Sequence, residues 1–423
     1  MTTAAASERP APPTTAPASG QPGPTTISDA GEAPISRDET AAHPGTSTVA
    51  SSRSDRRHLY QIDVVRLLTF VCVIGVHALP MTSSPDSVAS GALVVMLHFT
   101  RNAFFLLSAF VLFYVYARRD VRISAFWGHR FFYVGVPYLV WTGVYWWINA
   151  AGDRFTATNL RALGFDVFAG TGEYHLYFLL VSMQLYLVFP AMLWLVRRTA
   201  GYHLTLLLAS LVVELALMAL AHWVPWPGGW GDVQAHDYVL LPMYQFYFLA
   251  GGLAAVHFDR FHAWVVRHPV GVWGLVLGTG ALNLGSYAIQ VAQTGSPAQA
   301  SDPLQPSMVP WSLALTVGFY AAGCAYARRR RPGSRLARWV NQASLASFGV
   351  YLVHPLVLNV LLGRWLSFGA TAMPAAATGA LAWIGTVTLS GLFAVVAVHT
   401  PLALPLTGRR QVRPLSSRAE AAA

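Results

Sequence analysis

Two residues able to do chemistry, Arg66 and His77, lie inside the first long apolar run of the chain, residues 60–79. They are 11 residues apart, and at about 100° per residue this step exceeds three helical turns by only about 20°. We therefore expect both side chains on nearly the same face of one helix. Asp63 shares that face and can neutralise the arginine. Because an arginine in a membrane helix costs several kcal/mol unless it faces protein or water, the pair marks a candidate functional site.

The spacing of this pair suggests how it can work. At 1.5 Å per residue, Arg66 and His77 are separated by about 16 Å along the helix axis, so they can hold the two ends of a long ligand. A planar guanidinium suits phosphate, and an imidazole suits proton transfer near neutral pH. Two other interpretations stay open. Asp63 and Arg66 can form a buried pair that only fixes helix packing, with His77 at the interface, or the three residues can form a proton relay in a transporter.

The composition is that of an integral membrane protein. Hydrophobic residues make up 54% of the 423 residues and charged residues 11%, and the mean hydropathy is +0.45. The net charge of +10 does not indicate nucleic-acid binding, because the arginines form short clusters between apolar runs, as in positive-inside loops. Cys72 and Cys324 lie in apolar segments without metal-ligand spacing, so neither a disulfide scaffold nor a metal site is predicted.

The apolar runs predict an all-α, polytopic membrane protein with about ten transmembrane helices. Each span needs roughly 20 mainly apolar residues. The runs that meet this requirement are 59–80, 91–117, 131–150, 174–196, 202–223, 239–257, 269–291, 309–327, 344–363 and 375–399.

The distribution of arginine predicts the orientation of these spans. One alternating set of connections is rich in arginine, which places both termini in the cytoplasm of a multi-pass cell-membrane protein. The rich set contains Arg53, Arg56, Arg57, Arg118, Arg119, Arg122, Arg130, Arg197, Arg198, Arg260, Arg267, Arg328, Arg329, Arg330, Arg331, Arg335, Arg338, Arg409, Arg410 and Arg413. The poor set contains Arg154, Arg161 and Arg364.

The same pattern predicts the domain organisation. Residues 1–55 are rich in Ala, Pro, Thr, Ser and Gly, and we predict a disordered cytoplasmic tail there. This segment lacks the features of a secretory signal. Residues 56–405 are predicted to form the transmembrane domain, and residues 406–423 a basic cytoplasmic tail.

Further polar residues lie at membrane depth. Arg101 is expected near the middle of the second span, with His98 in the same sector and at a depth similar to that of His77. We expect this face to meet the first helix, with Arg101 either pairing with Asp63 or contacting the ligand. The alternative is that backbone carbonyls satisfy the charge of Arg101.

Two more candidates, Glu173 and His175, open the fourth span on the outer side. The carboxylate can orient the imidazole of His77 or bind the hydroxyls of an acceptor. A solvated pair at the interface is the alternative. His354, in the ninth span, suits packing or catalysis equally well.

Five sequence segments occur in a fixed order along the chain. The first is the helix that carries Arg66 and His77, and the others are FFLLSAF at 104–110, FWGHRFFYVGVPYLVW at 126–141, YHLYFL at 174–179 and ASLASFGVYLVHP at 343–355. Together they resemble the membrane-bound acyltransferase 3 family, and the resemblance extends from about residue 58 to 400. Two positions depart from the family pattern. Ala109 replaces the usual glycine, and Tyr133 replaces the second arginine of a cytoplasmic Arg-x-x-Arg pair.

The resemblance implies an O-acyltransferase that moves an acyl group, usually acetyl, from cytoplasmic acyl-CoA to a hydroxyl. The acceptor would be a carbohydrate, a glycan or a lipid-linked molecule, as in modification of the cell envelope. His77 would be the general base, with Arg66 and Asp63 in the same catalytic group. Tyr133 is uncharged at a position where the family has a donor-binding arginine. The basic residues that could take the place of that arginine are His129, Arg118, Arg119 and Arg122.

The remaining site residues follow from this assignment. Arg130, Arg66 and Arg101 would bind the acyl-CoA donor, and Glu173, His175 and His98 would bind the acceptor. A second class of function stays open: a transporter or flippase for a glycan or small solute that uses the Asp, Arg and His residues as a relay. A non-catalytic membrane partner is a third. Consumption of acyl-CoA with release of a thiol distinguishes the enzyme from the other two.

Overall fold

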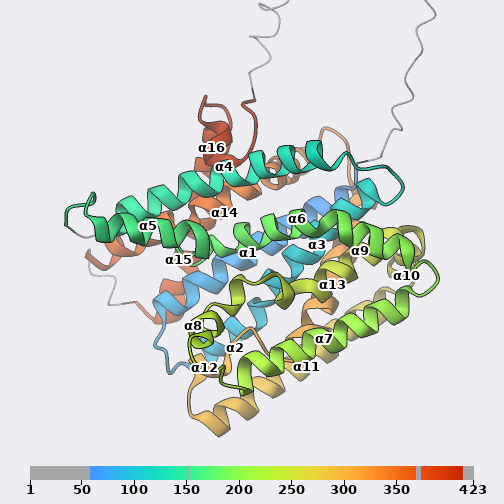
Figure 1. Ribbon diagram of the computed structural model, residues 1–423, viewed down its shortest axis with the longest axis horizontal. Helices are drawn as coiled ribbons and strands as arrows, with labels where there is room; N and C mark the ends of the chain where they lie inside the picture. Colours follow the sequence, from blue (N-terminus) through green and yellow to red (C-terminus); the bar gives the residue numbers. More distant parts are fainter. Residues whose placement is uncertain (1–57, 151, 368–372, 413–423) are drawn as a thin grey trace, which may run out of the picture. The chain divides into compact units, whose positions relative to one another are not determined.

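The computed structural model describes residues 58–150, 152–367 and 373–412, and within these ranges it contains helices and connections but no strand (Figure 1). This confirms the all-α prediction, whereas the predicted tail at 1–55 lies outside the described residues. The helices are α1 (Tyr60–Thr82), α2 (Val88–Leu97), α3 (Phe99–Tyr116), α4 (Ile123–Asn149), α5 (Ala157–Ala169), α6 (Tyr177–Arg198), α7 (His203–Trp223), α8 (Trp230–Gln234), η1 (Asp237–Val239), η2 (Leu241–Tyr244), α9 (Gln245–Val256), α10 (Phe258–Arg267), α11 (Pro269–Thr294), α12 (Pro297–Ala300), α13 (Met308–Arg329), α14 (Arg335–Ser367), α15 (Ala375–Ala397) and α16 (Ala403–Thr407).

Eight helices in the described part of the chain are long and apolar enough to cross a membrane. These candidate spans are Tyr60–Thr82, Val88–Tyr116, Tyr177–Arg198, His203–Ala221, Pro269–Thr294, Met308–Arg329, Arg335–Arg364 and Ala375–Ala397. The protein is therefore a polytopic membrane protein, as its sequence predicts.

The structure has eight candidate spans rather than the predicted ten, because two of the apolar runs do not form a helix that is both long and apolar enough to cross a membrane. In the run 239–257, Pro242 lies in the 3₁₀ turn η2, and α9 begins only after it. With 12 residues, α9 extends about 18 Å, less than the roughly 30 Å of a hydrocarbon core. The run 131–150 lies in α4, which has 27 residues. It is rich in Trp, Tyr and Gly, which are less apolar than aliphatic residues.

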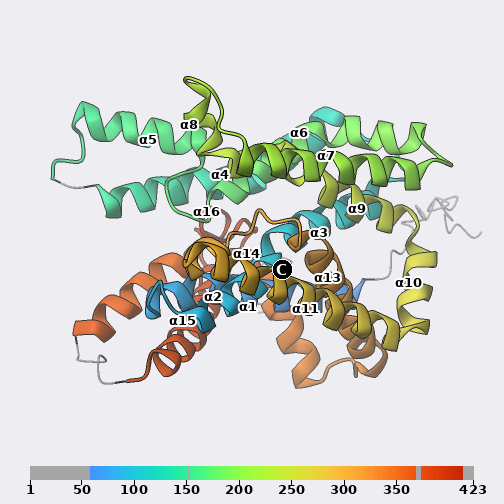
Figure 2. The ribbon, with the colours of Figure 1, turned by 90° about the horizontal axis from the view of Figure 1, so that it is seen from below.

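The first helix, α1, lies at the centre of the bundle. In its most apolar window 61% of the residues are buried, against 17% for α7, and it packs against α2, α3, α13, α14 and α15 (Figure 2). At Gly323 of α13 a Cβ atom would lie 2.5 Å from the carbonyl oxygen of Gln61. Trp383 of α15 donates a hydrogen bond from Nε1 to the carbonyl oxygen of Val71 at 2.7 Å. These contacts fix the rotation of α1 and so the direction of its polar side chains.

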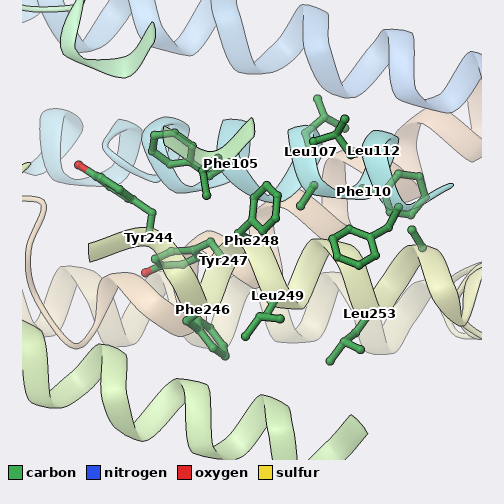
Figure 3. Close-up of a cluster of buried hydrophobic side chains, with 14 of the residues drawn as sticks. Phe105, Leu107, Phe110, Leu112, Tyr244, Phe246, Tyr247, Phe248, Leu249 and Leu253 are labelled. Atoms are coloured by element: carbon green, nitrogen blue, oxygen red, sulfur yellow. The ribbon is translucent and has the colours of Figure 1, made fainter. Parts of the chain in front are cut away.

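Helix α3 is fixed by close packing against α9. At Gly251 a Cβ atom would lie 2.0 Å from the carbonyl oxygen of Leu106, so glycine is required for this approach. Aromatic side chains of α3, η2 and α9 fill the space around the contact (Figure 3). The ring centroids of Phe105 and Tyr244, for example, are 4.3 Å apart. Because α3 also packs against α1, α6 and α13, α9 holds it in place beside the central helix.

The segment that follows α15 folds back onto the bundle. Helix α16 packs against α4, α14 and α15, and Trp141 of α4 donates a hydrogen bond to the carbonyl oxygen of Leu406 at 3.4 Å. The sequence places the beginning of a basic tail at residue 406. In the structure, its described part through Val412 packs against the transmembrane helices.

Candidate active site

A cavity of about 620 Å³ is lined by α1, α3, α4, α6, α14 and the segment after α16. We call it the inner cavity. Its lining includes five basic side chains and no carboxylate. The basic residues are Arg66, His129, Arg130, Arg409 and Arg410. A concave surface with this charge is suited to bind an anion with several phosphates.

Two of these arginines have free hydrogen-bond donors. Arg130 lies over the rings of Phe126 and Tyr186, at 5.8 and 5.6 Å from their centroids. Within the described residues, neither Arg130 nor Arg66 makes a hydrogen bond to protein. Both guanidinium groups can therefore donate to a ligand in the inner cavity.

Asp63 has partners other than those expected. It is buried, and it accepts hydrogen bonds from Nε2 of His58 at 2.5 Å and from Oγ of Ser344 at 2.8 Å. The predicted pairing with Arg101 is not formed. Asp63 lies 14 residues, or about 21 Å, along α1 from His77. Because Arg101 and His77 line the same cavity, Arg101 lies far from Asp63. Asp63 instead links the first turn of α1 to α14.

A second cavity, of about 120 Å³, contains His77. We call it the outer cavity. It brings together four of the residues predicted for the site: His77, His98, Arg101 and His175. His98 donates a hydrogen bond from Nδ1 to the carbonyl oxygen of Ser301 at 2.8 Å, which leaves its Nε2 as an acceptor. Residues of α1 and α3 thus line one cavity.

His77 contacts aromatic rings rather than a carboxylate. Its centroid is 4.3 Å from that of Tyr174 and 5.4 Å from that of His354. In the described part of the chain the His77 imidazole makes no hydrogen bond to protein, so both of its nitrogens are available to substrate. The structure therefore adds Tyr174 and His354 to the site. Both lie in segments that the sequence marks, but their contact with His77 depends on how α1, α6 and α14 pack.

Of the two candidates that precede α6, His175 lines the outer cavity and Glu173 does not. His175 is buried, and its ring centroid is 5.1 Å from that of His354. Burial, followed by the neighbouring imidazoles of His354 and His77, holds the pKa of His175 well below its usual value. Asn149 donates a hydrogen bond to the carboxylate of Glu173 at 3.5 Å, and burial raises the pKa of Glu173.

Arg101 lies in the outer cavity with His77, and not in the inner cavity with Arg66 and Arg130. Its guanidinium is 5.3 Å from the ring centroid of Tyr244. Among the described residues, the buried Nε of Arg101 has no hydrogen-bond partner. A buried cation with a free donor is suited to stabilise negative charge that develops in this cavity.

Three aromatic rings separate the two cavities. Phe104, Phe178 and Tyr351 line both of them. Their centroids are 5.3 Å apart for Phe104 and Phe178, 5.6 Å for Phe178 and Tyr351, and 6.1 Å for Phe104 and Tyr351. Tyr351 donates a hydrogen bond from Oη to the carbonyl oxygen of His175 at 2.5 Å. We call these three residues the aromatic partition.

The fold and the two cavities define a polytopic membrane protein with a basic inner cavity and a histidine-containing outer cavity. The sequence profile of the acyltransferase 3 family, described as an acyltransferase domain, matches residues 59–399. The chain belongs to this family and is an acyltransferase, the first of the three classes of function that its sequence suggests. No curated protein and no solved structure matches the chain. Among the described residues, no group of three or more His, Cys, Asp or Glu side chains is arranged to hold a metal ion.

Proposed function

We propose that this enzyme transfers an acetyl group from acetyl-CoA to a hydroxyl of a carbohydrate, glycan or lipid-linked acceptor. The observation that carries this proposal is the pair of cavities with one shared wall. The basic inner cavity suits the phosphates of the donor, and the outer cavity suits its reactive end. Arg66 and His77, about 16 Å apart along α1, match a donor whose phosphates and carbonyl are joined by a long arm.

The small outer cavity supports a short acyl group. Its volume of about 120 Å³ equals that of about four water molecules at roughly 30 Å³ each. An acetyl group and an acceptor hydroxyl fit in such a space, which favours a short acyl group over a long chain.

In the proposed mechanism, Arg66 and Arg130 bind the donor phosphates in the inner cavity. The arm of the donor passes the aromatic partition, so that the thioester carbonyl lies beside His77. His77 accepts the proton of the acceptor hydroxyl while the oxygen forms a bond to the carbonyl carbon. Arg101 stabilises the negative charge on the carbonyl oxygen. The carbon–sulfur bond then breaks, and the thiolate takes the proton from the imidazolium, which releases the free thiol and the ester.

Thiol release from acetyl-CoA by the purified protein in nanodiscs tests this function. We expect slow release by donor hydrolysis and faster release when a hydroxyl acceptor is added. Mass spectrometry of the acceptor should show one acetyl group gained per thiol released above the hydrolysis background. Absence of both donor binding and thiol release would contradict the proposal.

The aromatic partition predicts a change in acyl-chain selectivity. Replacement of Phe104 by alanine removes one of the three rings and widens the passage. We expect the ratio of kcat/KM for butyryl-CoA over acetyl-CoA to increase by about 10- to 200-fold, because each methylene group in an apolar pocket is worth about 1–3 kcal/mol. Phe132, whose side chain is exposed on α4, provides the control, and Phe132→Ala should leave the ratio unchanged. An unchanged ratio in Phe104→Ala would exclude the partition as the passage.

We further propose that the inner cavity opens to the cytoplasm of a cell whose plasma membrane holds the protein. The arginine-rich connections and the basic residues of this cavity lie at the same ends of the helices. The short helices α5 and α8 lie at the opposite end of the bundle from α10 (Figures 1 and 2).

Cysteine labelling tests this orientation. In intact cells, a membrane-impermeant maleimide should label Ser84→Cys, in the exposed turn after α1, but not Arg331→Cys, in the exposed turn after α13. After permeabilisation both variants should react, because both side chains reach water. The reverse pattern in intact cells would invert the topology.

A further inference from the structure

The segment after α16 carries two arginines into the inner cavity. Arg409 and Arg410 line this cavity together with Arg66 and Arg130. They lie beyond the residues that match the family profile, which end at 399. A pair of arginines near a chain end is usually a solvated topology signal, so its position in a cavity requires a structural cause.

Gly408 supplies the turn that directs this segment into the cavity. Its φ is +63°, a backbone conformation that favours glycine. A Cβ atom there would lie 2.4 Å from the ring of Phe348 and 2.9 Å from the carbonyl oxygen of Tyr133. The chain therefore passes between α14 and α4 only because residue 408 has no side chain.

Backbone and side-chain hydrogen bonds hold the other end of this segment, at Gln411 and Val412. The amide of Val412 donates to the carbonyl oxygen of Val398 at 3.0 Å. His399 donates from Nδ1 to the carbonyl oxygen of Val412 at 2.9 Å, and Gln411 donates from Nε2 to the carbonyl oxygen of His399 at 2.9 Å. With Gly408 on one side and Val412 on the other, the two arginines are held over the cavity.

Arg410 contacts Tyr133, which stands where the family pattern has the second arginine of its Arg-x-x-Arg pair. Its Nε donates a hydrogen bond to Oη of Tyr133, and its guanidinium is 5.9 Å from the ring centroid of Tyr133. Tyr133 lies three residues after Arg130 on α4, one helical turn further along the same face. The guanidinium of Arg410 thus lies beside the place where a second arginine of α4 would project.

The accumulated charge in this cavity is unfavourable without a ligand. Burial and the nearby charge of Arg66 lower the pKa of Arg409, while Asp63 raises it. Asp63 already accepts hydrogen bonds from His58 and Ser344. Four arginines in one cavity without a lining carboxylate repel one another until an anion binds.

We propose that Arg409 and Arg410 complete the phosphate site of the acyl-CoA donor, with Arg410 taking the role of the arginine that Tyr133 replaces. This inference rests on the proposed donor. Phosphate groups are the shared chemistry of CoA and of anionic lipid headgroups, and the position of this concave cavity next to the aromatic partition points to CoA. The last described turn of the chain then belongs to the donor site.

Calorimetric titration of CoA into the full chain in zwitterionic nanodiscs tests the assignment. We expect Arg410→Gln and Arg409→Gln each to raise the Kd for CoA by about 10- to 100-fold, as for loss of hydrogen bonds between charged groups. Arg331→Gln, which removes an exposed arginine outside the cavity, is the matched control and should leave the Kd unchanged. Thermal unfolding should confirm that all variants fold.

A double variant gives the sharper result. Arg410→Gln with Tyr133→Arg returns a guanidinium to the same region from α4, and it should recover most of the lost affinity. The KM for acetyl-CoA should follow the Kd across the series, with a smaller change in kcat. Recovery of affinity distinguishes a phosphate contact from a structural role of the Arg410–Tyr133 hydrogen bond, which the double variant does not restore.

Three outcomes would overturn the inference. If the wild type binds CoA and the arginine variants bind it equally well, Arg409 and Arg410 do not contact the donor, and the proposed function stands. If the variants change only the response of the unfolding temperature to added anionic lipid, the arginines bind headgroups. If the wild type neither binds CoA nor releases thiol from acetyl-CoA, the proposed function fails as well.

Discussion

Replacement of His77 by alanine is expected to lower kcat for acyl transfer by about 10²- to 10⁴-fold, the usual contribution of a general base. The imidazole lines the outer cavity, and it makes no hydrogen bond to protein within the described residues. Alanine at this position removes the group that is proposed to accept the proton of the acceptor hydroxyl as the ester bond forms. Acetyl-CoA turnover in nanodiscs, measured as thiol released per enzyme, provides the readout.

Binding of the donor should survive this substitution. The donor phosphates are expected in the inner cavity, on the other side of the aromatic partition, so the Kd for CoA should remain near the wild-type value. His268→Ala, at the exposed junction of α10 and α11, is the matched histidine control. If His77→Ala turned over acetyl-CoA at the wild-type rate, another residue of the outer cavity would be the base.

The second large effect is expected at Arg101. Its substitution by glutamine should lower kcat by about 10²- to 10³-fold, as for loss of a group that stabilises an oxyanion, with little change in the KM for acetyl-CoA. The cause is the free, buried Nε of Arg101 in the cavity of His77. Stopped-flow and steady-state kinetics with varied donor separate the two constants.

Arg66→Gln is the comparison variant for Arg101. It removes an arginine from the inner cavity, so it should raise the KM for acetyl-CoA with a smaller change in kcat. The opposite result, in which Arg101→Gln raises KM and leaves kcat intact, would place Arg101 in donor binding, as the sequence alone suggests. Arg101→Lys retains the charge without the planar fork and should recover only part of the rate.

The sequence by itself determined the features that depend on local periodicity. Apolar runs predict the membrane helices, and helical spacing places Arg66 and His77 on one face because both lie in the same helix. The resemblance in five segments identifies the acyltransferase 3 family, which the profile match confirms. Sequence also predicts that the second span, 91–117, presents His98 and Arg101 toward α1, since both residues project from one sector.

Only the tertiary structure decided which of these residues share a cavity. Periodicity fixes the direction of a side chain relative to its own helix, but the contacts between helices fix rotation and depth. Close packing of Gly251 against Leu106 holds α3 on α9, and Arg101 consequently lies with His77. Asp63 takes Ser344 as a partner from a helix 281 residues away in the sequence. The arginines after Gly408 line the inner cavity because packing against α4 and α14 closes the chain over it, and no local pattern predicts that contact.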